Sequence, residues 1–256
     1  MPTSRFDLDG KCALVTGGSR GLGKCMARAF AEAGADVMIT SRHEEELRAA
    51  AASIGDGLSR RVEWAVVDLT RPEEAEGLAR TAVARLGRVD ILVNNAGTNL
   101  PQPIDQVKDD AWETMLQLNL NSAMRLTRAL VPGMKERRWG RVIHISSVLG
   151  LGGKEGRNGY CATKAAVIGL AQASSLDLGP FGVTVNCIAP GPFLTDLPGK
   201  LLNDEQKKHF ADRTALGRWG RPEEIMGPAL LLASEAGSYI TGSTLVVDGG
   251  CTIRVL

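Results

Sequence analysis

The chain alternates short apolar runs with longer amphipathic stretches along almost its whole length. Seven runs have the length of buried strands: 12–17, 36–40, 62–68, 90–97, 141–147, 183–190 and 243–250. Six stretches between them have helical length and spacing: 22–34, 44–54, 73–86, 109–135, 160–178 and 222–234. This alternation predicts a parallel sheet covered on both faces, and right-handed crossovers make it doubly wound. We therefore expect an α/β fold with a doubly wound, seven-stranded parallel sheet and helices on both faces.

Length and composition limit the classes of protein to consider. The 256 residues show no linker-like segment and no fixed repeat, so we expect a single domain over residues 1–256. With 30 basic and 29 acidic residues, the chain lacks the charge excess of a nucleic-acid-binding or membrane-surface protein. No apolar run has the length of a membrane span, and the N-terminal stretch has no signal-peptide core. Five cysteines without CxxC spacing indicate reduced thiols, no metal site and a cytoplasmic location.

In doubly wound sheets ligands bind beyond the carboxyl ends of the strands, so the residues that follow each apolar run are the candidates. The first run ends in the glycine-rich loop TGGSRGLG at 16–23, and a helix follows. Its glycines permit a tight turn and a close approach, and the first N–H groups of the helix favour a diphosphate. We expect a Rossmann-type dinucleotide site; a plain strand-to-helix turn is the alternative. The candidate ligands in this loop are Gly17, Ser19, Arg20, Gly21, Leu22 and Gly23.

The end of the second run indicates which dinucleotide binds. A carboxylate there usually holds the ribose 2′-hydroxyl of NAD, but this chain has Ser41 and Arg42 instead. A guanidinium and a hydroxyl suit a 2′-phosphate, and Arg20 adds a second positive charge. We therefore expect NADP(H) to be preferred over NAD(H). The alternative is that Arg42 is a solvated surface charge.

Two further strand ends offer cofactor contacts. Asp68, followed by Leu69, ends the third run; it either accepts a hydrogen bond from the adenine amine or caps the turn before Pro72. Asn94 can be explained equally well by hydrogen bonding inside the sheet. The small and amide residues that suit a strand end lying under a ribose are Asn95, Ala96 and Gly97.

The candidate chemistry centres on Tyr160 and Lys164, which lie one helical turn apart. A phenol with a pKa of about 10 is a poor base at neutral pH. A lysine on the same helix face favours the phenolate and lowers that pKa, which tunes the tyrosine for proton exchange. A buried tyrosine beside a snorkelling lysine is the ordinary alternative. The fifth run delivers Ser146 and Ser147 to its carboxyl end, where a serine could hydrogen-bond a substrate oxygen.

Together these motifs resemble those of the short-chain dehydrogenases/reductases over nearly the whole chain. The glycine loop matches TGxxxGxG, NNAG at 94–97 is unchanged, and residues 160–164 match YxxxK. Ser147 lies thirteen residues before the tyrosine, the spacing of the family's serine, and Asn119 matches the family's asparagine. Pro190 and Gly191 begin a PGxxxT stretch that ends at Thr195. The glycine spacing differs from the TGxxGxxG of extended members.

The resemblance implies the catalytic roles. Tyr160 is the acid for carbonyl reduction and the base for alcohol oxidation, and Ser147 orients the substrate oxygen. Lys164 lowers the tyrosine pKa and holds the nicotinamide ribose, and Asn119 holds a water in a proton relay through Lys164. Pro190, Gly191 and Thr195 belong to the stretch whose backbone holds the nicotinamide carboxamide.

The resemblance gives fewer indications of the substrate. Family members use the segment corresponding to 192–214 as a substrate-binding flap. Charged and polar residues at 154–158 favour a hydroxylated or anionic substrate, and solvated loop charge is the alternative. The C-terminal region resembles both gluconate 5-dehydrogenases and 3-oxoacyl-carrier-protein reductases. We expect an NADP(H)-dependent oxidoreductase acting on a polyol, a sugar acid or a related small polar substrate, with the 3-oxoacyl reductase as the alternative.

Two other functions are weighed against an oxidoreductase: a non-catalytic sensor or scaffold, and a serine hydrolase. A non-catalytic dinucleotide-binding sensor or scaffold would not need the residues of a proton relay. A serine hydrolase would need a histidine base, and His144 faces away from Ser147 on a strand. A stripe of small residues at helical spacing packs either on its own sheet or on another subunit; it comprises Ala162, Ala165, Ala166, Gly169 and Ala173. The resemblance favours the second, in a homotetramer.

Overall fold

The computed structural model describes residues 4–195 and 204–253, and its centre is a parallel sheet. The seven strands are β1 Cys12–Thr16, β2 Asp36–Ser41, β3 Val62–Val66, β4 Ile91–Asn94, β5 Gly140–Ile145, β6 Val183–Pro190 and β7 Thr244–Val247. Their order is β3-β2-β1-β4-β5-β6-β7, and every neighbouring pair is parallel. The predicted doubly wound sheet is confirmed. The strand order reverses between β1 and β4, where such sheets bind their ligands.

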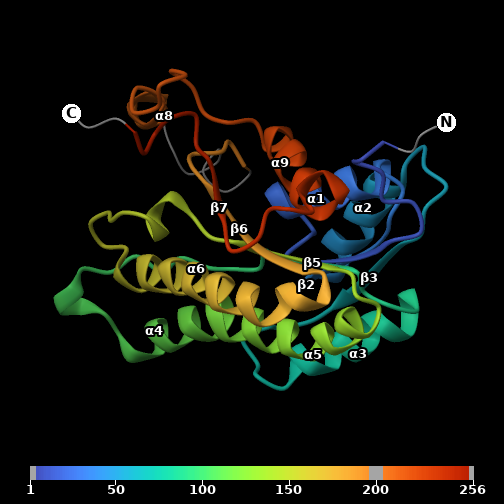
Figure 1. The fold of residues 1–256 in the computed structure, drawn as a ribbon. Helices are drawn as coiled ribbons and strands as arrows, with labels where there is room; N and C mark the ends of the chain where they lie inside the picture. Colours follow the sequence, from blue (N-terminus) through green and yellow to red (C-terminus); the bar gives the residue numbers. More distant parts are fainter. Residues whose placement is uncertain (1–3, 196–203, 254–256) are drawn as a thin grey trace.

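Helices cover both faces of this sheet (Figure 1). One face carries α1 Gly21–Glu32, α2 Glu44–Gly55 and α9 Met226–Ala233. The other carries α3 Glu74–Leu86, α4 Asp109–Leu116, α5 Ser122–Glu136 and α6 Asn158–Leu178. The short helix α8 Asp204–Ala211 lies apart from both groups in the view of Figure 1. No helix in the described parts of the chain has the length and apolar character that crossing a bilayer requires.

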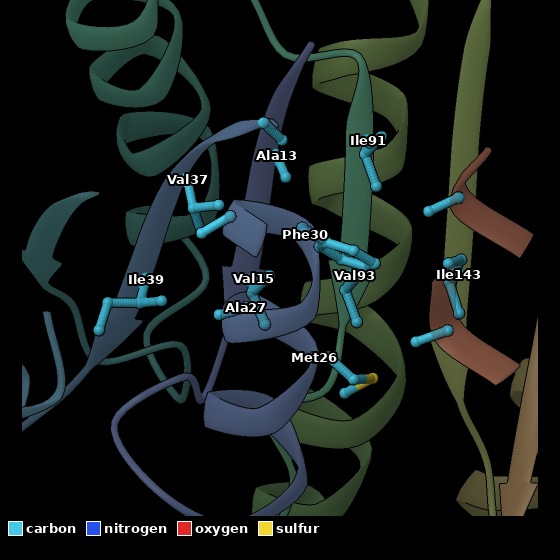
Figure 2. Packing of buried hydrophobic residues seen from close by; sticks show 14 of the residues in the cluster. Ala13, Val15, Met26, Ala27, Phe30, Val37, Ile39, Ile91, Val93 and Ile143 are labelled. Atoms are coloured by element: carbon cyan, nitrogen blue, oxygen red, sulfur yellow. The ribbon is translucent and has the colours of Figure 1, made fainter. Parts of the chain in front are cut away.

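Successive strand residues point to opposite faces of the sheet, so each strand contributes side chains to two hydrophobic cores, one on each face. Toward α1, strand residues such as Val15 and Val93 pack against Met26, Ala27 and Phe30 (Figure 2). Toward α3, α5 and α6, the alternate strand residues form a second buried cluster; it includes Leu14, Leu92, Val142 and Val185. Burial on both faces explains why the strands read as continuous apolar runs in the sequence.

Two predicted helices are interrupted in the structure. The stretch 109–135 contains a π-helical turn, Gln117–Asn121, between α4 and α5. Such a turn accommodates one extra residue and is frequent at functional sites. The stretch 222–234 opens with a 3₁₀ turn, Pro222–Ile225, before α9 begins. The Arg221 N–H there donates to Glu224 Oε2 at 2.7 Å, which fixes the tighter turn.

Candidate active site

The glycine loop joins β1 to α1 and has the shape that a diphosphate requires. Gly17 has φ +64° and Gly21 has φ +54°, values that favour glycine. A Cβ on Gly23 would collide with the carbonyl oxygen of Gly17, so side chains are excluded from this cradle. The first turn of α1 has neither a capping side chain nor an acidic residue, which leaves its N–H groups available. Leu22 anchors the turn by packing against the core below.

Asn95 links this loop to the end of β4. Its Nδ2 donates to the carbonyl oxygens of Thr16 and Gly17 at 2.8 and 3.0 Å. The Thr16 hydroxyl in turn accepts from the backbone N–H groups of Asn95 and Ala96, both at 3.0 Å. The Asn95 side chain is therefore a brace for the loop. Beyond it, a Cβ on Gly97 would lie 3.1 Å from Asn119 Oδ1 and 3.4 Å from Lys164 Nζ, so this strand end borders the catalytic side chains.

An acidic residue that the sequence analysis missed lies beside the glycine loop. The Ser19 hydroxyl donates to Glu46 Oε2 at 3.2 Å, and Arg20 Nη1 lies 4.0 Å from Glu46 Oε1. Glu46 belongs to an acidic triplet at 44–46 that opens α2. The triplet reads as an ordinary helix start, because acidic residues suit the first turn, and only the tertiary structure brings Glu46 to the loop.

Ser41 is the last residue of β2, and Arg42 follows it directly. Both residues therefore lie at the carboxyl edge of the sheet, as the glycine loop does. The Ser41 hydroxyl accepts from the His43 N–H at 3.2 Å. Arg42 is exposed, and no carboxylate of the described chain lies within 4.0 Å of its guanidinium. The side chain therefore remains available to an anion.

Asp68 makes the turn contacts that one of its two interpretations requires. Its Oδ1 accepts from the Thr70 N–H at 3.1 Å and from the Thr70 hydroxyl at 2.7 Å. Burial acts to raise the pKa of Asp68, but the Thr70 hydrogen bonds and the charge of Arg42 lower it below its ordinary value. Leu69 is buried, and its carbonyl oxygen accepts from Gln117 Nε2 at 3.3 Å. The adenine role of Asp68 stays a prediction.

The two serines that follow β5 have different surroundings. Ser146 is 2% exposed, and its hydroxyl donates to the carbonyl oxygen of Lys164 at 2.7 Å. Ser147 accepts from the Leu149 N–H at 3.1 Å, and its hydroxyl acts to lower the pKa of the Tyr160 phenol. Ser146 therefore holds α6 against the strand, and Ser147 is the serine that faces the tyrosine.

The pKa of Tyr160 is shifted in the direction opposite to the prediction. Burial raises it above its ordinary value, although Ser147 and the charge of Arg157 act to lower it. The Lys164 ammonium lies 5.5 Å from the centroid of the tyrosine ring, and its Nζ donates to the carbonyl oxygen of Ile145 at 2.7 Å. The predicted net lowering of the tyrosine pKa is wrong for this structure, because desolvation of the phenol outweighs the nearby charges; the contribution of Lys164 stays a prediction. Tyr160 keeps its proton at neutral pH.

Lys164 is itself strongly perturbed. It is 4% exposed, and burial lowers its pKa to about 8. The hydrogen bond to the Ile145 carbonyl compensates part of the desolvation of the ammonium. A lysine with this pKa can exchange a proton close to physiological pH.

Asn119 lies in the π-helical turn and contacts two threonines. Its Oδ1 accepts from the Thr98 N–H at 2.8 Å, and its Nδ2 donates to the Thr98 carbonyl at 2.9 Å and to the Thr163 hydroxyl at 3.0 Å. Thr163 directly precedes Lys164 on α6. Sequence reasoning missed both threonines, although Thr163 lies inside the YxxxK motif. The asparagine thus connects the ends of β4 and α6.

The stretch after β6 approaches the glycine loop. The Gly191 N–H donates to the Val247 carbonyl at 2.9 Å, which keeps the chain beside β7 after Pro190. A Cβ on Gly21 would lie 3.5 Å from Thr195 Cγ2, so Thr195 borders the loop as the predicted carboxamide site requires. Residues 196–203 of the predicted flap lie outside the described residues.

His144 is not a partner of Ser147. The histidine is 1% exposed, its Nδ1 lies 3.1 Å from Asn94 Nδ2, and burial lowers its pKa to about 4. Over residues 4–195 and 204–253 no histidine hydrogen-bonds the Ser147 hydroxyl, and no group of three or more histidines, cysteines or acids could hold a metal ion. Within the described residues Ser147 therefore has no histidine base of the kind that a serine hydrolase needs.

Comparison with known proteins shows which family the chain belongs to. A family model described as enoyl-(acyl carrier protein) reductase matches residues 17–252. The chain belongs to the short-chain dehydrogenase/reductase family. A 3-oxoacyl-[acyl-carrier-protein] reductase of Vibrio cholerae is 41% identical over 245 residues, which are 96% of this chain and 98% of the relative.

Solved structures of short-chain dehydrogenases/reductases superpose over nearly the whole chain. A gluconate 5-dehydrogenase of Burkholderia cenocepacia in complex with NADP and tartrate is 36% identical, with a TM-score of 0.92 and 100% of each chain covered. A 3-oxoacyl (acyl-carrier-protein) reductase of Agrobacterium tumefaciens with NADP bound is 34% identical, with a TM-score of 0.93 and 98% and 97% of the two chains covered. This protein is therefore an oxidoreductase of the family that binds a nicotinamide dinucleotide and acts on small-molecule substrates.

Proposed function

We propose that this short-chain dehydrogenase/reductase interconverts a secondary alcohol and a ketone on a small polar substrate, a polyol or a sugar acid, with NADP(H). The observation that carries the proposal is the position of Tyr160, which is half-buried, has the Lys164 ammonium 5.5 Å from its ring centroid and lies beside Ser147. The dinucleotide supplies or accepts the hydride, and the protein provides position and a proton.

In the reducing direction Tyr160 is the general acid. Ser147 donates a hydrogen bond to the carbonyl oxygen, and Tyr160 transfers its proton to the same oxygen as negative charge develops there. The phenol is protonated at neutral pH, so it has the proton that this step requires. General acid catalysis of this kind contributes roughly 10²–10⁴-fold to the rate.

Lys164 and Asn119 complete the site in this proposal. The Lys164 ammonium holds a ribose hydroxyl of the dinucleotide and returns a proton to Tyr160 after each turnover. Asn119 positions α6 through Thr163 and holds the water of the relay. In alcohol oxidation the same groups act in reverse, with the phenolate as base.

The NADP(H) preference rests on charge near the adenine ribose. Arg42 has no carboxylate within 4.0 Å among the described residues, although its charge reaches Asp68, and Ser41 precedes it with a hydroxyl. Two neighbours of known structure were crystallised with NADP. Glu46 acts against this preference, because it lies beside Arg20 and carries the same sign as a phosphate.

A second candidate, 3-oxoacyl-carrier-protein reduction, is favoured by the names of curated relatives at about 40% identity. The sugar-acid candidate is favoured by the gluconate 5-dehydrogenase neighbour, whose second ligand, tartrate, is a hydroxylated dicarboxylate. A panel of keto sugar acids, neutral keto sugars and 3-oxoacyl thioesters, each with NADPH and with NADH, separates the two. A panel without any NAD(P)H-dependent reduction would contradict both candidates and favour the non-catalytic sensor or scaffold.

The assembly proposed for this protein is a homotetramer. Ala162, Ala165, Gly169 and Ala173 are exposed, so this stripe does not pack on its own sheet. The stripe continues into Leu176, which is 80% exposed. An outward-facing line of small and apolar residues suits a helix–helix contact with a second copy. Light scattering of the purified protein tests it, and a monomer would contradict it.

The proposal also covers the domain organisation and the location of the protein. Residues 1–256 act as one domain, with 192–214 as the flap over the substrate. The five cysteines are free, which suits a cytoplasmic protein.

A further inference from the structure

Three positively charged residues, Lys154, Arg157 and Arg213, lie around the start of α6 and the end of α8. Arg157 lies directly before α6 and three residues before Tyr160, so the two side chains share one side of the helix start. The backbone of Arg157 is fixed there, because its N–H donates to the Lys154 carbonyl at 3.1 Å and it forms a bridge with Gln102. Its guanidinium is close enough to act on the Tyr160 phenol. A group bound by Arg157 would therefore lie near the reacting carbonyl.

Lys154 and Arg213 bring the other two charges to the same place. The Lys154 ammonium lies 4.4 Å from the ring centroid of Phe210, on α8. Arg213 follows α8 by two residues, and its charge reaches Lys154, as does that of Arg157. The three cations therefore lie where the loop after β5 meets the end of α8, and Arg157 is three residues before Tyr160.

This arrangement is electrostatically unfavourable in the protein alone. In the described chain no carboxylate lies within 4.0 Å of any of the three cationic groups. Glu155 partly offsets the repulsion at Lys154, but burial and the two arginines together lower the lysine pKa. The nearby Arg218 shows the usual alternative, with two contacts of 2.7 Å to Glu224. Like charges that no close ion pair neutralises indicate that an anion is to be bound.

We propose that Lys154, Arg157 and Arg213 bind an anionic group of the substrate, a carboxylate or a phosphate, while the substrate's carbonyl is held at Ser147 and Tyr160. This inference rests on the proposed function and narrows its substrate class. Arginine side chains bind such groups with paired hydrogen bonds, and lysine adds a point charge. The ring of Phe210 contacts the Lys154 ammonium and so helps to orient the lysine side chain. Neutral ketones would react at the same tyrosine but without this anchor.

The test compares charged and neutral substrates in matched pairs. The first pair is a keto sugar acid and the neutral keto sugar with the same carbon chain. The second pair is a 3-oxoacyl phosphopantetheine thioester, which carries a phosphate, and the N-acetylcysteamine thioester, which does not. For each pair the measured quantity is the ratio of kcat/KM, charged over neutral, for wild type, Lys154→Gln, Arg157→Gln, Arg213→Gln and the control Arg80→Gln. Arg80 is an exposed cation on α3, so its removal changes the net charge equally away from the site.

We expect the wild type to prefer the charged member of at least one pair by tenfold or more. Each arginine substitution should lower that ratio about tenfold, chiefly through KM, and Arg80→Gln should leave it unchanged. The pair that shows the effect identifies a carboxylate or a phosphate as the anion. A ratio near one in both pairs, or a ratio that the three substitutions do not change, would overturn the inference and leave the ketone reductase activity established. Absence of reduction for all four substrates would instead contradict the proposed function itself.

Discussion

The Nζ atom of Lys164 donates a hydrogen bond to the carbonyl oxygen of Ile145 at 2.7 Å. Ile145 is the last residue of β5, two residues before Ser147, and Lys164 lies one helical turn after Tyr160. The bond therefore fixes the tyrosine-bearing helix to the strand that carries the serine. Because Ser146 also donates to the Lys164 carbonyl, the lysine is held by both its ammonium and its backbone, and the two reacting hydroxyls keep a fixed relation.

The pKa of Lys164 predicts a pH dependence of cofactor binding. With a pKa of about 8 the side chain is charged at pH 7 and largely neutral at pH 9.5. The ammonium donates to the ribose more strongly than the amine, so we expect the Kd for NADPH to rise several-fold over this range. Fluorescence titration from pH 7 to 9.5 measures it, above the range in which a phosphate titrates. Lys164→Met should bind more weakly and without this slope, and an equal slope in the variant would assign the effect to another group.

His144 predicts a loss of stability in acid. Its pKa of about 4 in the folded chain lies below the ordinary value of about 6.5. The unfolded chain therefore binds more protons between these values, and stability present above pH 6.5 is lost as the pH falls toward 4. The size of the shift corresponds to about 3 kcal/mol. Urea unfolding at pH 7, 5.5 and 4.5 should show this loss in wild type and a smaller one in His144→Asn, which keeps an acceptor for Asn94. Parallel pH profiles would contradict the assignment.

Arg42 tests the coenzyme preference. Arg42→Ala should weaken NADPH binding by about 1.5–3 kcal/mol, the scale of a hydrogen bond to a charged group, and leave NADH nearly unaffected. Equilibrium binding of both coenzymes gives the two changes. The control Arg80→Ala removes an exposed arginine away from the site. Equal losses for NADPH and NADH would show that Arg42 does not contact a 2′-phosphate.

Glu46 predicts a change in the opposite direction. Its carboxylate lies beside Ser19 and Arg20, where it repels a 2′-phosphate and occupies the arginine. Glu46→Gln keeps an acceptor for the Ser19 hydroxyl but removes the charge, so NADPH should bind roughly fivefold more tightly, about 1 kcal/mol for one charge pair in water. NADH should change little. The matched control is Glu45→Gln, an exposed neighbour in the same turn. Weaker NADPH binding in Glu46→Gln would mean that the carboxylate supports the phosphate site.

Local features made the fold predictable. The strand β1 reads as a strand because four of its five residues are apolar, and all five are buried in the structure. The glycine loop reads as a turn because its closely spaced glycines permit a positive φ, which Gly17 has. The π-helical turn at Asn119 was not predictable, because the helical spacing of 109–135 runs through it without interruption. The register of that turn is set by tertiary contacts to Thr98 and Thr163.

The sequence allowed the residues of the candidate site to be predicted, but not the direction in which the pKa of Tyr160 is shifted. Tyr160 and Lys164 show their adjacency in the sequence, but spacing does not reveal that Lys164 is buried and Tyr160 half-buried. Burial determines both shifts, and it raises the tyrosine pKa where the charge of the lysine alone would lower it. The contact of Glu46 with Arg20 joins two elements 26 residues apart, and no local pattern records it.

The most direct test of the account is the exchange of Tyr160 for Phe, which keeps the ring and deletes the proton. Carbonyl reduction at saturating NADPH is measured together with the NADPH dissociation constant, in wild type and in Tyr160→Phe. We predict that kcat falls by roughly 10²-fold or more, while NADPH binding stays within threefold because Lys164 and the glycine loop are unchanged. Reduction by Tyr160→Phe at the rate of the parent protein would contradict the assignment of Tyr160 as the proton donor.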